Sequence, residues 1–202
     1  MASRLAPMPF AHLNLRYNPF GEIERSQRAR VAIVEPWTLR PGDLVQIIGD
    51  SGRGKTTQLL ALQAAHAGAV YELVPEGANR VVRDVPPGVV LLVDEAQRLA
   101  RAHLERLLAR PGALVLGTHR DLSASSRRAM RSVLLSGLAA AHLSAIVDAR
   151  IEAARGAPGP VPRIGRGALA HLIARHGDDV RAIEHHLYDV FQSLEGPIDV
   201  EL

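Results

Sequence analysis

Short apolar runs separated by polar, glycine-containing segments form the main pattern of the first two thirds of the chain. Three of these runs are Leu44–Ile48, Val89–Val93 and Ala113–Leu116, and only Gln46 interrupts them. Near-continuous apolar runs of this kind are typical of strands that are buried on both faces of a parallel sheet. Apolar residues at helical spacing follow the first run, at Thr57–Ala65. This alternation of strand and helix predicts an α/β fold.

Weaker patterns predict the remaining elements of this part. Ala69–Val74 and His142–Asp148 are expected to be strands, and Ala96–Arg110 and Ser123–Leu135 are expected to be helices. A turn-rich link joins Val31–Val34 to the first apolar run, which favours a hairpin or two neighbouring strands. Together these elements would complete a parallel sheet that is sandwiched between helices.

Proline and glycine mark the boundaries between parts of the chain. Three prolines predict an extended arm over residues 1–22, because proline disfavours a helix both at its own position and at the residue before it. A Gly/Pro-rich linker at Arg155–Pro162 precedes two segments of helical spacing. We therefore predict an arm at 1–22, an α/β core at 23–155 and a small helical domain at 156–202.

Composition narrows the class of protein. The 202 residues are 47% hydrophobic and 22% charged, which is typical of a globular domain. The chain has no cysteine, which excludes a disulfide scaffold, a Cys-based zinc or iron–sulfur site and a thiol nucleophile. Because neither a membrane span nor a secretory signal is recognisable, we expect a cytoplasmic protein.

The basic residues are almost all arginine. Of the 24 Lys and Arg residues, only Lys55 is a lysine. A position that keeps lysine against this background is a candidate for a site that needs a compact ammonium group instead of a planar guanidinium. The net charge of +3 is spread along the chain, so it permits binding to DNA without demonstrating it.

A glycine-rich motif surrounds this lysine. Residues 49–56, GDSGRGKT, fit the pattern G-x-x-x-x-G-K-[ST] at every fixed position, between a predicted strand and a predicted helix. Backbone N–H groups of such a loop and the helix N-terminus attract phosphate, Lys55 would neutralise the β- and γ-phosphates, and the Thr56 hydroxyl would ligate Mg²⁺. The candidate ligand-binding residues are Gly49, Asp50, Ser51, Gly52, Arg53, Gly54, Lys55, Thr56 and Thr57.

Two acidic residues end the second long apolar run. Asp94 and Glu95 would lie at the carboxyl edge of the sheet, where open α/β sheets bind their ligands. Asp94 is expected to hold the Mg²⁺ shell, and Glu95 is expected to act as the general base that activates a water molecule. The alternative is that Asp94 only caps the helix that follows.

These motifs resemble those of the AAA+ superfamily of ATPases over residues 42–195, and the order Asp94-Glu95-Ala96-Gln97 is similar to bacterial transposition and secretion ATPases of that superfamily. The resemblance implies a P-loop NTPase fold with a C-terminal helical lid. It also implies a polar "sensor 1" residue after the third run, for which Thr118 matches best and His119 next. Arg181 matches the "sensor 2" arginine of the lid.

The resemblance implies two further contacts. An arginine of the segment after the third run, Arg128 or Arg131, is expected to reach the phosphates of a neighbouring subunit; the alternative is a solvated basic face or a contact to nucleic acid. Tyr17 and Phe20 are candidates for contact with adenine, and the alternative is that Phe20 attaches the arm to the core.

We therefore expect an ATPase that uses ATP and Mg²⁺ as a molecular switch. It would remodel or regulate a protein or DNA-bound partner through nucleotide-dependent homo-oligomerisation. A small-molecule or nucleoside kinase and a non-hydrolysing, nucleotide-gated adaptor remain alternatives. Only residues 58–88 separate the phosphate loop from the acidic strand, which is too short for the helical insert of an ABC-type ATPase.

Overall fold

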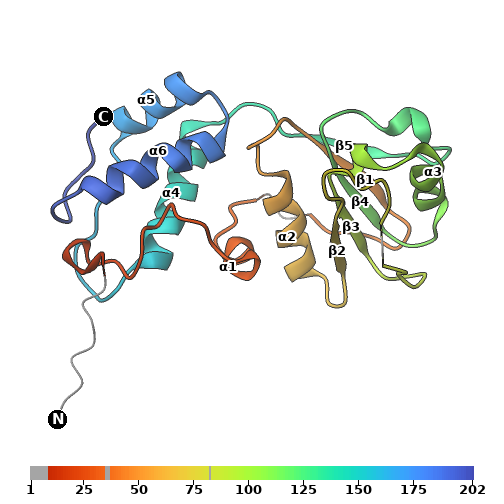
Figure 1. Cartoon of the computed structure of the whole chain (residues 1–202), viewed down its shortest axis with the longest axis horizontal. Coiled ribbons are helices and arrows are strands. Elements are labelled where there is room, and N and C mark those ends of the chain that lie inside the picture. The colour runs from red at the N-terminus through yellow and green to blue at the C-terminus, as the bar shows by residue number, and fades with distance from the viewer. Residues whose placement is uncertain (1–8, 35–36, 82) are drawn as a thin grey trace, which may run out of the picture. The chain divides into compact units, whose positions relative to one another are not determined.

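The computed structural model describes residues 9–34, 37–81 and 83–202, which form two compact units. An α/β unit comprises Arg25–Ser136, and a helical unit combines the N-terminal segment up to Glu24 with Gly137–Leu202 (Figure 1). The chain therefore enters the α/β unit at Arg25 and leaves it after Ser136, so the helical unit is built from both ends of the sequence.

The α/β unit contains a five-stranded, all-parallel sheet in the order β2-β3-β4-β1-β5. This confirms the predicted α/β fold with a parallel sheet. The strands are β1 (Leu44–Ile48), β2 (Val70–Leu73), β3 (Leu91–Asp94), β4 (Leu114–Thr118) and β5 (Arg131–Leu134). The helices of this unit are α1 (Arg25–Arg30), α2 (Lys55–Ala65) and α3 (Arg101–Ala109), with short 3₁₀ turns at Ala96–Arg98 and Ser123–Ser125.

Helices cover both faces of this sheet, with α2 and α3 on opposite sides (Figure 1). Successive strand residues alternate between two apolar clusters: Leu92 packs in the α2 cluster with Leu59, whereas Leu91 and Val93 pack in the α3 cluster with Leu104. Burial on both faces explains why the central strands have near-continuous apolar sequences.

Gln46 is the polar residue that interrupts the first apolar run, and it is buried in β1. Its side-chain amide donates to the Asp121 carboxylate at 2.6 Å and to the Ser132 hydroxyl at 2.8 Å, and its oxygen accepts from the Leu122 N–H at 2.8 Å. The buried amide therefore has partners for both of its polar atoms and fastens β1 to the segments that follow β4.

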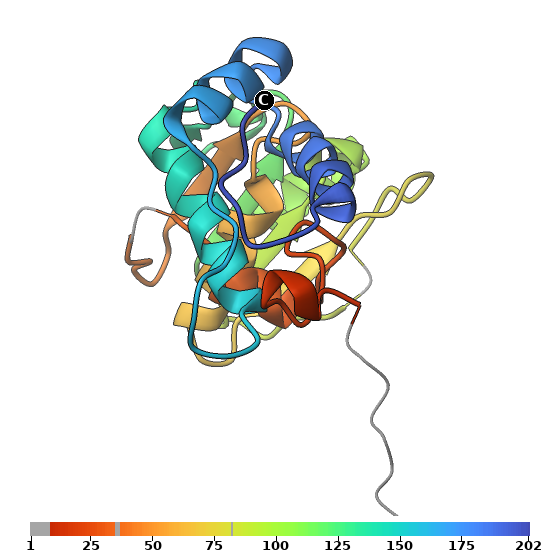
Figure 2. The ribbon, with the colours of Figure 1, turned by 90° about the vertical axis from the view of Figure 1, so that its left-hand side faces the viewer.

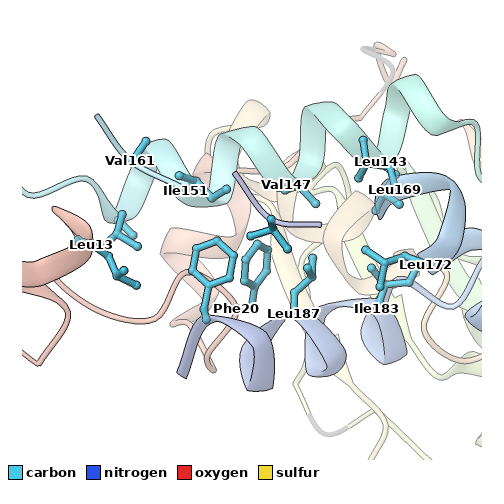
Figure 3. Packing of buried hydrophobic residues seen from close by; sticks show 14 residues of the cluster. Leu13, Phe20, Leu143, Val147, Ile151, Val161, Leu169, Leu172, Ile183 and Leu187 are labelled. Atoms are coloured by element: carbon cyan, nitrogen blue, oxygen red, sulfur yellow. The ribbon is translucent and has the colours of Figure 1, made fainter. Parts of the chain in front are cut away.

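The helical unit contains α4 (Ala140–Ala154), α5 (Arg166–His176) and α6 (Val180–Ser193), whose ribbons are drawn in teal to blue in Figure 2. Buried residues of all three helices form one apolar core. The N-terminal segment, with a 3₁₀ turn at Ala11–Leu13, contributes Leu13, Leu15 and Phe20 to that core. Figure 3 shows Phe20 among the side chains of α4 and α6. The centroid of its ring lies 5.0 Å from that of Phe191, in an edge-on arrangement.

Three predicted elements are wrong. Residues 142–148 lie in helix α4, where Leu143, Val147 and Ile151 share a buried face at a spacing of four residues. The segment 123–135 forms a 3₁₀ turn and strand β5, because the backbone of Arg131–Leu134 pairs with the edge of β1. Residues 31–34 lie outside any strand.

The predicted part boundaries also differ from the two compact units. Helix α4 packs against α5 and shares its core with α6, so the helical unit begins at Gly137 and includes α4, whereas we predicted its start at 156. The predicted arm belongs to this unit as well. Its backbone follows the end of α4, with Arg16 N–H donating to Ala154 at 2.8 Å and Gly156 N–H donating to Asn14 at 2.9 Å.

Candidate nucleotide-binding site

The glycine-rich loop joins β1 to α2 and has the backbone that its glycines permit. Gly52 and Gly54 have φ values of 81° and 84°, in the left-handed region that glycine adopts without strain. At Gly49 a Cβ would lie 3.2 Å from both the Cβ and the carbonyl oxygen of Leu135, so a side chain would crowd the end of β5. Arg53 pairs with Asp50 at 3.0 Å within the same loop.

Lys55, the only lysine of the chain, is 6% exposed at the start of α2. Its ammonium donates to the carbonyl oxygens of Gly49 and Asp50 at 2.7 and 2.8 Å. The loop therefore closes around a buried positive charge, next to the N-terminus of an eleven-residue helix. Fixed N–H groups, a helix N-terminus and an ammonium group together attract the phosphates of a nucleotide.

Asp94 lies at the carboxyl end of β3 with an exposure of 1%. The Thr56 hydroxyl donates to its Oδ2 at 2.6 Å, which joins the phosphate loop to the acidic strand across β4. Gly117 of β4 makes room for this contact, since a Cβ there would lie 2.8 Å from Asp94 Oδ1. A hydroxyl and a carboxylate are oxygen ligands of the type that Mg²⁺ prefers, so these two residues fit a magnesium site.

Tyr71 of β2 also contacts this carboxylate, and sequence reasoning missed it. Its hydroxyl donates to Asp94 Oδ2 at 2.9 Å. Burial raises the pKa of Tyr71 above its ordinary value, and the charge of Asp94 and the hydrogen bond to it act in the same direction, so the phenol stays protonated. A tyrosine in a predicted strand is ordinary, and only the parallel pairing of β2 with β3 reveals the contact.

Glu95 follows Asp94 with a left-handed backbone, at φ 60° and ψ 37°. Its carboxylate accepts from Gln97 at 2.7 Å and lies 3.3 Å from both Arg98 and His119. Burial raises the pKa of Glu95, but the Arg98 charge and the hydrogen bonds from Gln97 and His119 outweigh burial, so the pKa lies below its ordinary value. The carboxylate is ionised at neutral pH, as a general base must be.

Of the two sensor 1 candidates, His119 has the polar contacts within this cluster. Its Nε2 lies 3.3 Å from Lys55 Nζ and 3.3 Å from Glu95 Oε1. Thr118 is buried, and its hydroxyl donates to the Arg120 carbonyl at 2.9 Å. The sequence therefore indicated a polar residue directly after the third apolar run. The contacts favour His119 over Thr118 for the sensor 1 role.

The two candidate trans-acting arginines make contacts within their own unit. Arg128 donates to the carbonyls of Arg110 at 2.9 Å and of Gly42, and so ties the loop before β5 to two turns. The guanidinium of Arg131 lies 4.7 Å from the centre of the Trp37 ring. A role for either arginine at a neighbouring subunit stays a prediction.

The other candidate residues belong to the helical unit. Phe20 is buried against Phe191, which favours the alternative that Phe20 attaches the arm, and the Tyr17 hydroxyl donates to the Ala153 carbonyl at 3.1 Å. Asp179 caps α6 by accepting from the Ala182 N–H at 3.1 Å. Arg181 lies exposed in the first turn of that helix, and its role at the phosphates stays a prediction.

The parallel sheet, the glycine loop before α2 and the acidic end of β3 together define a P-loop NTPase fold, and with its C-terminal helices the chain has the fold of the AAA+ ATPases. It is similar to RuvB of Thermotoga maritima, a Holliday junction branch migration motor, with a TM-score of 0.55 and 19% identity over 77% of this chain. A mutant of the same protein gives a TM-score of 0.57 and 20% identity over 78% of this chain.

The present chain spans 57–58% of these RuvB chains. The matches support the fold of the superfamily and not the narrower group of transposition and secretion ATPases. No protein-family model matches the sequence, and no curated protein sequence matches it significantly. In the part of the chain that the structure describes, the helices are too short or too polar to cross a membrane.

Proposed function

We propose that this protein binds ATP together with Mg²⁺ and hydrolyses the bond between the β- and γ-phosphates. The observation that carries the proposal is the contact of the phosphate loop with the acidic strand: Thr56, which follows the buried Lys55 in the chain, donates to Asp94 at 2.6 Å. This arrangement places a hydroxyl, a carboxylate and one positive charge at the N-terminus of α2, which matches what a magnesium–triphosphate group requires.

Each residue of the site then has a defined task. The loop amides and Lys55 bind the phosphates, and Thr56 and Asp94 hold the metal ion, whose charge neutralises the phosphate oxygens. Glu95 orients a water molecule and accepts its proton, for which it is already ionised. His119 lies beside both Lys55 and Glu95 and can keep the cation and the base at a fixed separation.

The test compares Glu95→Gln and Lys55→Ala with the unchanged protein. We expect Glu95→Gln to bind ATP with similar affinity in calorimetry while its turnover falls at least about a hundredfold, because only the base is lost. Lys55→Ala should lose the magnesium-dependent binding itself. Glu105→Gln is the matched control, since Glu105 forms an ion pair with Arg101 on α3 and should leave both quantities unchanged. No magnesium-dependent uptake of ATP by the folded protein would refute the proposal.

We further propose that the nucleotide state controls self-association and the affinity for a protein or DNA-bound partner. The support is the similarity to a motor named for Holliday junction branch migration. Mass measurements in solution with ATP and with ADP test the assembly. Binding to branched and linear duplexes at rising salt tests the partner, because an interface that neutralises many phosphates weakens steeply with salt. An unchanged mass and flat DNA binding would contradict this part.

A non-hydrolysing adaptor is the second candidate. It is favoured by the three polar neighbours that hold Glu95, since a carboxylate that stays paired with Arg98 is unavailable to a water molecule. The same Glu95→Gln comparison separates the two functions. An adaptor would bind ATP without measurable turnover before and after the substitution.

A further inference from the structure

The carboxylate of Asp94 is held by more than the phosphate loop. Three hydrogen bonds reach it from described residues. The Thr56 hydroxyl and the Tyr71 hydroxyl both donate to Oδ2, at 2.6 and 2.9 Å, and the Glu95 N–H donates to Oδ1 at 3.0 Å. Thr56 belongs to the glycine-rich motif, in the first turn of α2, and Glu95 is the residue that follows Asp94 in the chain. Tyr71 is the partner that comes from a different strand.

The position of Tyr71 is set by strand pairing and by packing. In the register of β2 with β3, Tyr71 lies beside Leu92, two residues before Asp94, so its side chain can run along the sheet to the carboxylate. Its ring is buried in the α2 cluster, where Leu59 and Leu60 also pack. The guanidinium of Arg25 lies 5.2 Å from the ring centre. The hydroxyl is therefore presented to Asp94 by a ring that packing holds in place.

The arrangement matters for Thr56. A hydroxyl ligates a metal ion through its oxygen lone pairs, so its proton needs an acceptor on the other side. Asp94 Oδ2 is that acceptor, and a carboxylate that is free to rotate would not fix the direction of the Thr56 oxygen. A second donor on the same Oδ2 fixes the carboxylate plane. Groups that orient the ligands of a metal ion strengthen its binding although they do not touch the ion.

We propose that Tyr71 is a positioning residue of the magnesium site, which acts by fixing Asp94 and, through it, Thr56. This inference rests on the proposed binding of magnesium and ATP. It assigns the orientation of the metal ligands to a strand outside both sequence motifs. The alternative is that the hydroxyl only provides a hydrogen bond to a buried carboxylate. In that case its removal lowers the stability of the fold and leaves the magnesium dependence of nucleotide binding unchanged.

The test is Tyr71→Phe, which keeps the ring and removes one hydroxyl. The measured quantity is the magnesium concentration that gives half-maximal binding of a fluorescent ATP analogue. We expect this concentration to rise about tenfold, as for the loss of other groups that orient metal ligands. Binding of the analogue without magnesium should stay the same. Tyr188→Phe in α6 is the matched control and should leave both values unchanged.

A second measurement keeps the test independent of stability. In an Asp94→Asn background, Tyr71→Phe should have little further effect, because the group through which it acts is already altered. An unchanged magnesium midpoint in Tyr71→Phe, or equal effects in both backgrounds, overturns the inference and leaves the proposed function intact. If the unchanged protein shows no magnesium-dependent binding of the ATP analogue, the proposed function is overturned instead.

Discussion

At the scale of single residues, one ring nitrogen lies between the two charged groups of the candidate site. His119 Nε2 lies 3.3 Å from Lys55 Nζ and at the same distance from Glu95 Oε1. A neutral imidazole nitrogen either accepts a hydrogen bond or donates one, so it serves the ammonium in one tautomer and the carboxylate in the other. His119 is therefore the side chain that contacts both the ammonium of the loop and the carboxylate that follows β3.

The proposed role of Glu95 as the base predicts a pH dependence of turnover that its neighbours set. Its pKa lies below the ordinary 4.5, so the ionised base is retained until the pH falls through that lowered value. Arg98→Gln removes the neighbouring positive charge and should raise this pKa. We expect the acid limb of the kcat/KM profile to move to higher pH, because the ionised carboxylate loses the positive charge that stabilises it. Arg101→Gln, which breaks an exposed ion pair on α3, is the control. An acid limb that does not move would show that a different group controls it.

At the scale of elements, the sequence predicts what local burial determines and misses what long-range pairing determines. The central strands and the loop before α2 were predicted, because burial on both faces and the glycine motif leave clear local patterns. Strand β5 was missed because its burial is low and its pairing with the edge of β1 is not visible in its own residues. The contact of Tyr71 with Asp94 depends on the strand order in the same way.

Strand β4 carries a prediction about packing between the two motifs. At Gly117 an added Cβ would lie 2.8 Å from Asp94 Oδ1 and 2.9 Å from Leu59 Cδ1, so Gly117→Ala must displace both the Asp94 carboxylate and the Leu59 side chain. We expect a loss of about 1–3 kcal/mol in the free energy of unfolding, measured by urea denaturation. Gly167→Ala is the contrast, since a Cβ on that residue of α5 meets nothing within 4 Å. Equal stability of the two variants would contradict this packing.

At the scale of the whole molecule, the helical unit depends on residues that lie before and after the α/β unit in the sequence. Asn14 shows this dependence: its side chain donates to the carbonyls of Ala157 and Pro160 at 3.0 and 3.1 Å and accepts from the Ala157 N–H at 3.1 Å. In the sequence, the α/β unit therefore lies between the two parts of the chain that build the helical unit.

Phe20 distinguishes a packing role for the N-terminal segment from a role in nucleotide binding. Its ring is 5% exposed and packs edge-on against Phe191, so Phe20→Ala should cost about 3–5 kcal/mol, as for other buried aromatic residues. Amide hydrogen exchange without nucleotide should then lose protection in α4 and α6 and keep it in β1, β3 and β4. Ile198→Ala, at a residue that is 59% exposed, is the control. If Phe20→Ala keeps full protection and loses only affinity for ATP, the residue contacts the nucleotide base instead, because a ligand contact contributes nothing in the absence of ligand.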